Sequence, residues 1–326
     1  MSSMRSAGIL GTFFLSTMAA ASMQQAPSAP LAPVAVQASS QAAVYDINYA
    51  LSDWRRLRAS SGYSFADYAR FVNANPGWPG ESGIRRSAER AMRAGENANT
   101  VLAFFRSTEP QTGNGWARLA EANLAVGRSA EALAAARGAW VSGDLSQFDE
   151  QSLFARFGSQ LTAADHDKRV DALLFDKKYS DAYRMLAWAS PSRRAAFQAR
   201  IAMQSRMGDA EQRYQAVIGQ VTSDAGLMMD RARYLRDSGY VQASRDLFAR
   251  SHSFTAKPAD PERFLDMMAM LAKEAAGDRQ WQTAYNIGSQ IDDVFGPGAD
   301  ISLKSYAIRD EYTTTSGPRA PSRSSG

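Results

Sequence analysis

Few residues of this chain have the types and spacing needed for metal binding or proton transfer. Its 326 residues include two histidines and no cysteine, which excludes cysteine nucleophiles, disulfides, iron–sulfur clusters and thiolate zinc sites. The string Asp165-His166-Asp167 could hold a metal or donate a proton, but no second histidine or acidic cluster stands nearby at ligand spacing. We expect it to begin a helix, capped by Thr162 or Asp165, and we expect no metal or other cofactor.

Two further acidic groups have structural interpretations. Asp260 and Glu262 flank Pro261, where a helix N-terminus would favour negative charge. Asp292-Asp293 follows an apolar residue and is typical of the solvated edge of a helix. Neither group predicts a catalytic carboxylate pair, and no catalytic residue is assigned.

The first third of the body contains candidate contacts for a glycan or an acidic polymer. The string Asn75-Pro-Gly-Trp78-Pro-Gly80 predicts a rigid turn whose indole could stack on a sugar, although packing of Trp78 against a helix is the favoured expectation. Nearby arginines are expected on solvated helix faces that could meet an acidic polymer. The candidate contacts are Trp78, Arg55, Arg56, Arg85 and Arg86. The 37 basic and 33 acidic residues give a net charge of only +4, which does not indicate nucleic-acid binding.

The first 43 residues are expected to lie outside the folded domain. Residues 1–21 carry one positive charge, an apolar run and the small residues Ala19-Ala20-Ala21, which predict a secretory signal peptide and a periplasmic location. Residues 22–43 are uncharged and rich in Ala, Pro, Gln and Ser, which predicts a flexible linker. No later run approaches the ~18 apolar residues of a membrane-spanning helix, so we expect no integral membrane segment after cleavage.

Residues 44–312 are rich in helix-forming residues, with prolines at the breaks between short segments. The clearest unit runs from Trp116 to Trp140 and predicts two helices joined by a turn at Gly127. Its apolar and small residues recur at helical spacing and fall at tetratricopeptide offsets, although Ala136 replaces the usual Phe. They are Trp116, Ala120, Leu124, Ala132, Ala136 and Trp140.

Turn glycines predict further hairpins. Gly208, Gly239 and Gly277 are separated by 31 and 38 residues, which bracket the ~34-residue period of helical-pair repeats. We therefore expect an all-α fold, an α-superhelix (solenoid) of tetratricopeptide-like hairpins over residues 44–312. A non-repetitive helical bundle is the alternative.

Four strings in this order resemble the N-terminal superhelical, U-shaped region of soluble lytic murein transglycosylases. The resemblance covers roughly residues 44–312. It implies a scaffold that helps to hold peptidoglycan strands, in a family that cleaves β-1,4 bonds between N-acetylmuramic acid and N-acetylglucosamine to 1,6-anhydro ends. The strings are Tyr68–Gly80, Leu161–Leu174, Asp230–Arg236 and Ala272–Tyr285.

The family's catalytic domain follows its superhelix and uses one Glu as acid and base, within Glu-Ser and Gly-Leu-Met-Gln motifs. Here Glu81-Ser82 is followed by Gly-Ile, and Gly226-Leu-Met228 is followed by Met229, so no catalytic residue is carried over. Residues 301–312 predict a helix, but residues 313–326 contain only Thr, Ser, Gly, Pro, Arg and Ala. We interpret residues 313–326 as a disordered, out-of-frame tail of a truncated or frameshifted gene, which would lack the catalytic domain.

The sequence therefore predicts a periplasmic superhelical scaffold of the lytic transglycosylase family, which binds peptidoglycan, takes part in cell-wall turnover and is inactive alone. The alternative is a secreted tetratricopeptide-like adaptor that binds protein partners. A third reading, an autonomous muramidase, would require a carboxylate pair that the sequence does not reveal.

Overall fold

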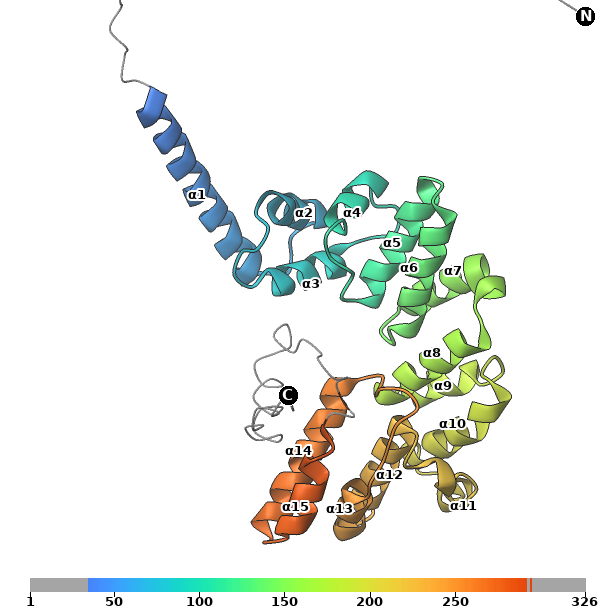
Figure 1. Cartoon of the computed structure of the whole chain (residues 1–326). Helices are drawn as coiled ribbons and strands as arrows, with labels where there is room; N and C mark the ends of the chain where they lie inside the picture. The colour runs from blue at the N-terminus through green and yellow to red at the C-terminus, as the bar shows by residue number, and fades with distance from the viewer. Residues whose placement is uncertain (1–34, 292–293, 295–326) are drawn as a thin grey trace, which may run out of the picture. The chain divides into compact units, whose positions relative to one another are not determined.

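The structure, a computed structural model, describes residues 35–291 and residue 294. Every regular element in this part of the chain is a helix, fifteen of them α-helices and two short 3₁₀-helices, with no strand (Figure 1). The all-α prediction is confirmed. The α-helices are α1 (Ala35–Ala59), α2 (Phe65–Ala74), α3 (Glu81–Ala91), α4 (Ala98–Phe104), α5 (Gly113–Ala125), α6 (Ser129–Val141), α7 (Gln147–Phe157), α8 (Ala163–Phe175), α9 (Tyr179–Met185), α10 (Pro191–Gln204), α11 (Ala210–Gln215), α12 (Ala225–Asp237), α13 (Val241–Ala249), α14 (Pro261–Gly277) and α15 (Trp281–Gly288). The 3₁₀-helices are η1 (Gly158–Gln160) and η2 (Ile218–Gln220).

The chain divides into two compact units, residues 1–51 and residues 52–326. In the first unit α1 begins at Ala35, so residues 35–43 of the predicted linker are helical. The physical reason is that this stretch follows the last proline of the region, Pro33, and is rich in alanine. The predicted signal peptide at 1–21, the helix at 301–312 and the tail at 313–326 lie outside the described residues.

In the second unit, helices that are neighbours in the sequence pack together as hairpins. The closest associations are α5 with α6, α8 with α9, α10 with α11, α12 with α13, and α14 with α15. Successive hairpins also contact each other, through α6 with α8, α10 with α12, and α13 with α15. Each hairpin therefore buries its apolar side against the hairpins before and after it.

The five hairpin turns share one hydrogen-bonding pattern. A residue at positive φ lies two positions after the end of each first helix, and the residue after it donates its N–H to the carbonyl five positions earlier, at 2.8–2.9 Å. This is the Schellman motif, which satisfies carbonyl groups that a helix end would otherwise leave unpaired. The residues at positive φ are Gly127, Lys177, Arg206, Gly239 and Arg279.

Four of these hairpins also share one register, counted from the positive-φ residue. The fifth residue after it is small in each second helix, and the eighth and ninth are buried. A small side chain lets the two helices of a hairpin approach closely, and the two later positions face the core. The small residues are Ala132, Ala182, Ser244 and Ala284, and the buried pairs are Ala135-Ala136, Met185-Leu186, Leu247-Phe248 and Ile287-Gly288.

The predicted hairpin between Trp116 and Trp140 is confirmed as α5 and α6, with Gly127 at φ 78°. The other turn glycines mark hairpins, but they do not always occupy the position with positive φ. Gly277 is the last residue of α14, and Arg279 adopts φ 60° two residues later. Likewise Arg206, not Gly208, has positive φ. Counting glycines also missed the hairpin of α8 and α9, because Lys177 takes the glycine position there.

Backbone strain at these turns gives a testable prediction. An L-residue in the left-handed region costs about 1 kcal/mol relative to glycine, so Arg279→Gly is expected to raise the free energy of unfolding by that amount. Gly239→Ala is expected to lower it by a similar amount, since the added methyl group meets no neighbouring atom and only the φ of 86° is unfavourable. Thermal and urea unfolding measure both changes in the free energy of unfolding. Two changes of the same sign would contradict the assignment of backbone strain to these turns.

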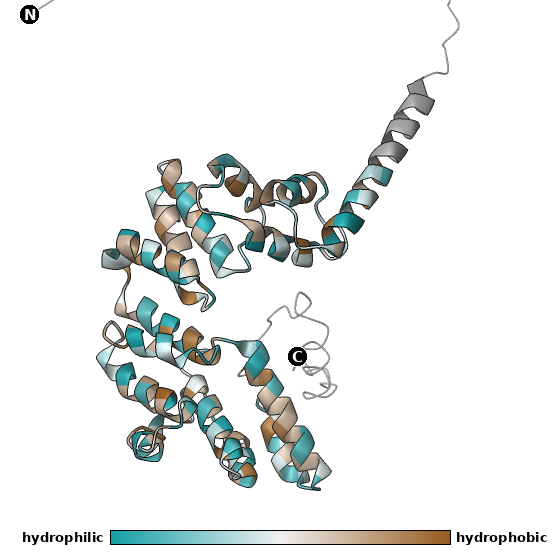
Figure 2. Ribbon diagram, turned by 180° about the vertical axis from the view of Figure 1, so that it is seen from behind, coloured by the Kyte–Doolittle hydropathy of each residue, from teal (hydrophilic) through white to brown (hydrophobic). Residues whose placement is uncertain are grey.

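The core of the second unit is a series of local clusters rather than one centre. Four clusters of buried apolar residues follow each other along the chain, formed mainly by residues 57–104, 117–157, 140–201 and 175–294. Figure 2 shows hydrophobic and hydrophilic residues alternating along the helices, as expected when each helix buries one face. Each cluster therefore depends on hairpins that are adjacent in the sequence.

Ion pairs also join helices that are distant in the sequence. Arg118 on α5 bonds Asp149 on α7, Arg200 on α10 bonds Asp230 on α12, and Arg206 bonds Asp237. Polar contacts therefore add to the apolar contacts between neighbouring hairpins.

Candidate functional site

Trp78, one of the predicted polymer contacts, packs into the fold. Its ring centroid lies 5.7 Å from that of Phe71 and 6.2 Å from that of Trp54, in tilted and edge-on geometries. Trp54 in turn donates its indole N–H to the carbonyl of Pro79 at 2.7 Å, which fixes the proline-rich turn against α1. The structural use of Trp78 that the sequence favoured is therefore the one that the structure shows.

Arg85 corrects the expectation that it contacts a polymer. Its residue surface is 5% exposed, and its guanidinium bonds Glu81 at 2.6 Å and the carbonyl of Phe104 at 3.0 Å. The same group lies over the ring of Phe104, 5.0 Å from its centroid. Arg85 is thus enclosed because it ties α3 to α4, a contact that helical periodicity alone does not reveal.

The other three predicted arginines are less buried than Arg85. Arg55 and Arg86 are exposed, the first on α1 and the second on α3. Arg56 is half-buried, bonds Asp53 at 2.7 Å and lies over the ring of Tyr63. The exposed guanidinium groups of Arg55 and Arg86 remain candidate contacts, as separate charges.

The Asp165-His166-Asp167 string serves the fold. Asp165 and Thr162 form a reciprocal capping box at the start of α8, and Asp167 accepts hydrogen bonds from the N–H and hydroxyl of Ser190. His166 is buried among Trp140, Phe154 and Trp188, and this burial lowers the pKa of its imidazole. Within the described residues, no three His, Cys, Asp or Glu side chains are placed to hold a metal ion.

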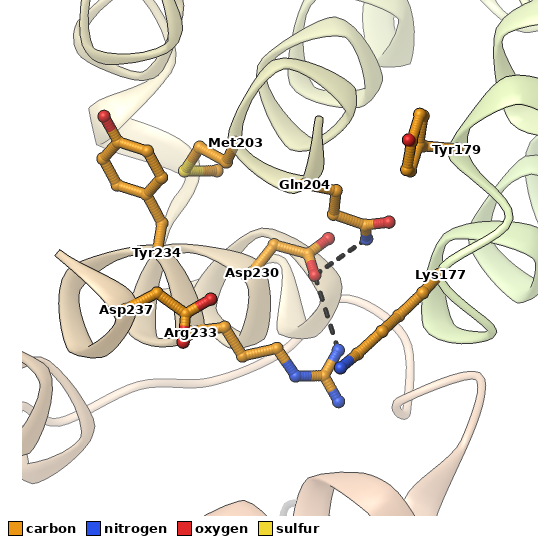
Figure 3. Close-up of a pocket in the computed structure, with 8 residues that line it drawn as sticks. All are labelled: Lys177, Tyr179, Met203, Gln204, Asp230, Arg233, Tyr234 and Asp237. Atoms are coloured by element: carbon orange, nitrogen blue, oxygen red, sulfur yellow. Dashed lines mark hydrogen bonds and ion pairs between the residues drawn. The ribbon is translucent and has the colours of Figure 1, made fainter. Parts of the chain in front are cut away.

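A polar pocket outside the predicted residues is the strongest candidate site. It lies between the turn that joins α8 to α9 and the helices α10 and α12 (Figure 3). Its cavity measures about 150 Å³. The lining residues are Lys177, Tyr179, Met203, Gln204, Asp230, Arg233, Tyr234 and Asp237.

The floor of this pocket is a buried ion pair. Arg200 and Asp230 are both enclosed, and the Nε of Arg200 bonds Asp230 at 2.7 Å. A second carboxylate, Asp171, bonds the other side of the guanidinium. Burial opposes the charge of Arg200, but Asp230 and Asp171 outweigh that effect and raise its pKa above the ordinary value.

Gly226 explains how the guanidinium of Arg200 fits at this place. A Cβ atom at Gly226 would overlap the guanidinium, so only glycine allows α12 to approach it. Gly226 therefore has a steric reason to be glycine. This reason is independent of the resemblance between Gly226-Leu-Met228 and a catalytic motif.

The pocket carries two cations, Lys177 and Arg233, and its two carboxylates also serve other donors. Asp230 is bonded by Arg200 and by the amide of Gln204, and Asp237 pairs with Arg206 at 3.0 Å. Arg233 forms an ion pair with Asp230 at 3.6 Å, but its buried Nη1 donates no hydrogen bond. Within the described residues, the ammonium of Lys177 forms no ion pair. Figure 3 shows Lys177 and Arg233 reaching toward each other.

Burial makes the positive charge of Arg233 energetically unfavourable. Desolvation lowers the pKa of Arg233, Asp230 offsets part of this effect, and Arg263 and Arg200 add to it. A guanidinium stays protonated in proteins, so the lowered pKa reports a charge that burial leaves poorly solvated. An anion in the pocket would offset that cost.

Sequence reasoning did not find this site. Lys177 and Lys178 are adjacent, and Arg231, Arg233 and Arg236 alternate with apolar residues along α12, as solvated helix faces often do. The one local signal is positional, because Lys177 occupies the turn position that is glycine in two of the five hairpins.

The described residues form an all-α protein of consecutive helical hairpins, with a polar pocket that contains two cationic side chains. Comparison with protein families, with curated proteins and with solved structures finds no match to this chain. Among the described residues, no helix combines the length and apolar content needed to cross a bilayer.

Proposed function

We propose that this chain is a tetratricopeptide-like α-superhelical scaffold that binds peptidoglycan in the periplasm. The observation that carries the proposal is the repeated hairpin, with its Schellman turn, its small fifth residue and its buried eighth and ninth residues. Units of this kind stack into superhelices that present a long binding surface. The four strings that resemble the superhelical region of soluble lytic murein transglycosylases supply the ligand class, and residues 1–21 supply the export signal.

The charge distribution supports an acidic polymer as the ligand. Peptidoglycan stem peptides carry carboxylates. Within the described residues Lys177 forms no ion pair, and Arg233 shares the carboxylate of Asp230 with Arg200 and Gln204. Arg55 and Arg86 add exposed positive charge at the other end of the unit's sequence. Binding requires no covalent step, so the proposed role is to hold strands in place during cell-wall turnover.

The full chain is expected to co-sediment with purified sacculi at low salt and to be released as salt rises. The reason is that the Debye length falls from about 10 Å at 0.1 M to about 3 Å at 1 M salt. The sedimented fraction, measured from low to high salt, tests this expectation. Failure to sediment at low salt would contradict the proposal, and release of 1,6-anhydro muropeptides would show that the chain is more than a scaffold.

A second candidate function, an adaptor for protein partners, is favoured by one separate observation. Trp281 and Tyr285 lie one turn apart on α15 and are 66% and 69% exposed, and Tyr240 is 65% exposed at the start of α13. Exposed aromatic residues are enriched at protein interfaces. Recovery of a specific protein partner in a pull-down, together with no retention on sacculi, would favour this function over the first.

A further inference from the structure

We propose that the pocket of Lys177, Gln204 and Arg233 binds the C-terminal residue of a peptide through its free carboxylate. In this arrangement the Lys177 ammonium and the Arg233 guanidinium donate to the ligand carboxylate, while the Gln204 side-chain oxygen accepts the N–H of the same ligand residue. The inference does not depend on peptidoglycan being the ligand, because stem peptides and proteins both end in a free carboxylate.

Two cations of the pocket can accept further negative charge, because one of them shares its carboxylate and the other has none in the described part of the chain. Arg233 has a buried Nη1 without a hydrogen bond, and Lys177 has no ion pair within the described residues. The two Asp230 oxygens already accept from Arg200 and Gln204, so the carboxylate nearest to Arg233 is shared with other donors. A ligand carboxylate would satisfy both cations at once, and charge-assisted hydrogen bonds are stronger than neutral ones.

The orientation of Gln204 adds a second requirement for the ligand. Its Nε2 donates to the carbonyl of Leu174 at 2.8 Å and to Asp230 at 2.9 Å, and these two acceptors identify the nitrogen end of the amide. The oxygen end is consequently fixed, and it is buried without a hydrogen bond. A ligand that offers only negative charge would leave this acceptor unsatisfied, whereas an amino-acid residue brings an N–H two bonds away from its carboxylate carbon.

The size and walls of the pocket suit the end of a chain. A volume of about 150 Å³ lies below the roughly 300–1,000 Å³ of sites that enclose whole small molecules. Tyr179, Tyr234 and Met203 provide apolar surface beside the charged groups, where a small side chain such as a methyl group can pack. The geometry therefore favours a terminal residue with a small side chain.

Calorimetric titration of the full chain with four dipeptides tests this inference. The probes are N-acetyl-D-Ala-D-Ala and N-acetyl-L-Ala-L-Ala, each as the free acid and as the C-terminal amide. At least one free acid is expected to bind at least about tenfold more tightly than its amide, because the amide removes the charge-assisted bonds. Preference for the D-dipeptide identifies a stem peptide as the source, and preference for the L-dipeptide identifies a protein C-terminus.

Matched variants separate the pocket from general charge. Lys177→Gln and Arg233→Gln are each expected to weaken binding of the free acid about tenfold, and Lys177→Arg to retain it. Lys168→Gln is the control, since Lys168 is exposed on the same hairpin, outside the pocket, and carries the same charge. If Arg233→Gln unfolds the protein, the Lys177→Gln variant still tests the inference, since Lys177 lies in a turn.

The inference is overturned by any of three results. These are equal affinity for acids and amides, no binding of either free acid at millimolar concentration, and identical effects of Lys177→Gln and Lys168→Gln. Retention on sacculi is measured separately, so loss of that retention with intact dipeptide binding would reject the proposed polymer and leave the pocket assignment standing.

Discussion

Replacing Arg200 with methionine is expected to lower the free energy of unfolding by about 3–5 kcal/mol. Arg200 is 0% exposed and joins three helices, since it lies on α10 and bonds Asp230 on α12 and Asp171 on α8. Its guanidinium also lies over the ring of Phe175. Removing it leaves the buried carboxylate of Asp230 with the amide of Gln204 and a single ion pair to Arg233, at 3.6 Å and without a hydrogen bond.

Urea unfolding of the variant and of two controls checks this expectation. Arg213→Met breaks a pair with Asp209 whose side chains are 38% and 40% exposed, so its cost is expected to stay below about 1 kcal/mol. The double variant Arg200→Met with Asp230→Leu is expected to be more stable than the single one, because it also removes the stranded carboxylate. A single-variant loss as small as that of Arg213→Met would show that the buried pair does not hold these helices.

Replacing Glu89 with alanine is the second large effect, expected to cost about 3 kcal/mol. Glu89 is 0% exposed, and its carboxylate accepts from the backbone N–H groups of Gln111 and Thr112, at 2.9 and 2.7 Å, and from the Thr112 hydroxyl. These donors lie at the start of α5 and lose their acceptor in the variant. Glu131→Ala, on the exposed surface of α6, is the control and is expected to change stability little.

The same variant, compared with wild type across pH, tests the ionisation of Glu89. Burial raises the pKa of Glu89 above its ordinary value of 4.5, and the three hydrogen bonds offset only part of that effect. A raised folded-state pKa means that the folded protein binds the proton more tightly than the unfolded chain. The advantage of wild type over Glu89→Ala is therefore expected to be largest below pH 4.5 and to shrink as pH rises through the raised pKa. An advantage that grows with pH over this range would contradict the assignment.

The turn at Lys177 illustrates why the repeat could be predicted only in part. Glycine marks a left-handed turn in a sequence, and Gly127 and Gly239 were found in this way. Lys177 and Arg279 adopt the same backbone conformation, because the two helices on either side are packed together tightly enough to impose it. Tertiary packing outweighs a local preference of about 1 kcal/mol, and such positions carry no signal of their own.

Arginine residues show the same limit for the candidate site. Arg85 and Arg233 both lie on helices within stretches rich in charge, and nothing local distinguishes them. Arg85 meets Glu81 and the carbonyl of Phe104 and becomes part of the core, whereas Arg233 stands beside a carboxylate that Arg200 and Gln204 already use. The difference depends on which residues of other helices come within a few ångströms.

The sequence by itself determined that the described chain is helical and that residues 116–140 form a hairpin, because both follow from side-chain spacing within one or two turns of helix. It also favoured the packing of Trp78 and the helix-capping role of Asp165. The tertiary structure alone decided which charged groups have their own polar partners, as Arg200 and Glu89 do, which share a partner, as Arg233 does, and which form no ion pair within the described residues, as Lys177 does. Many of these partners lie 20 to 31 residues apart on different helices, so their distances are set by how hairpins pack rather than by any local pattern.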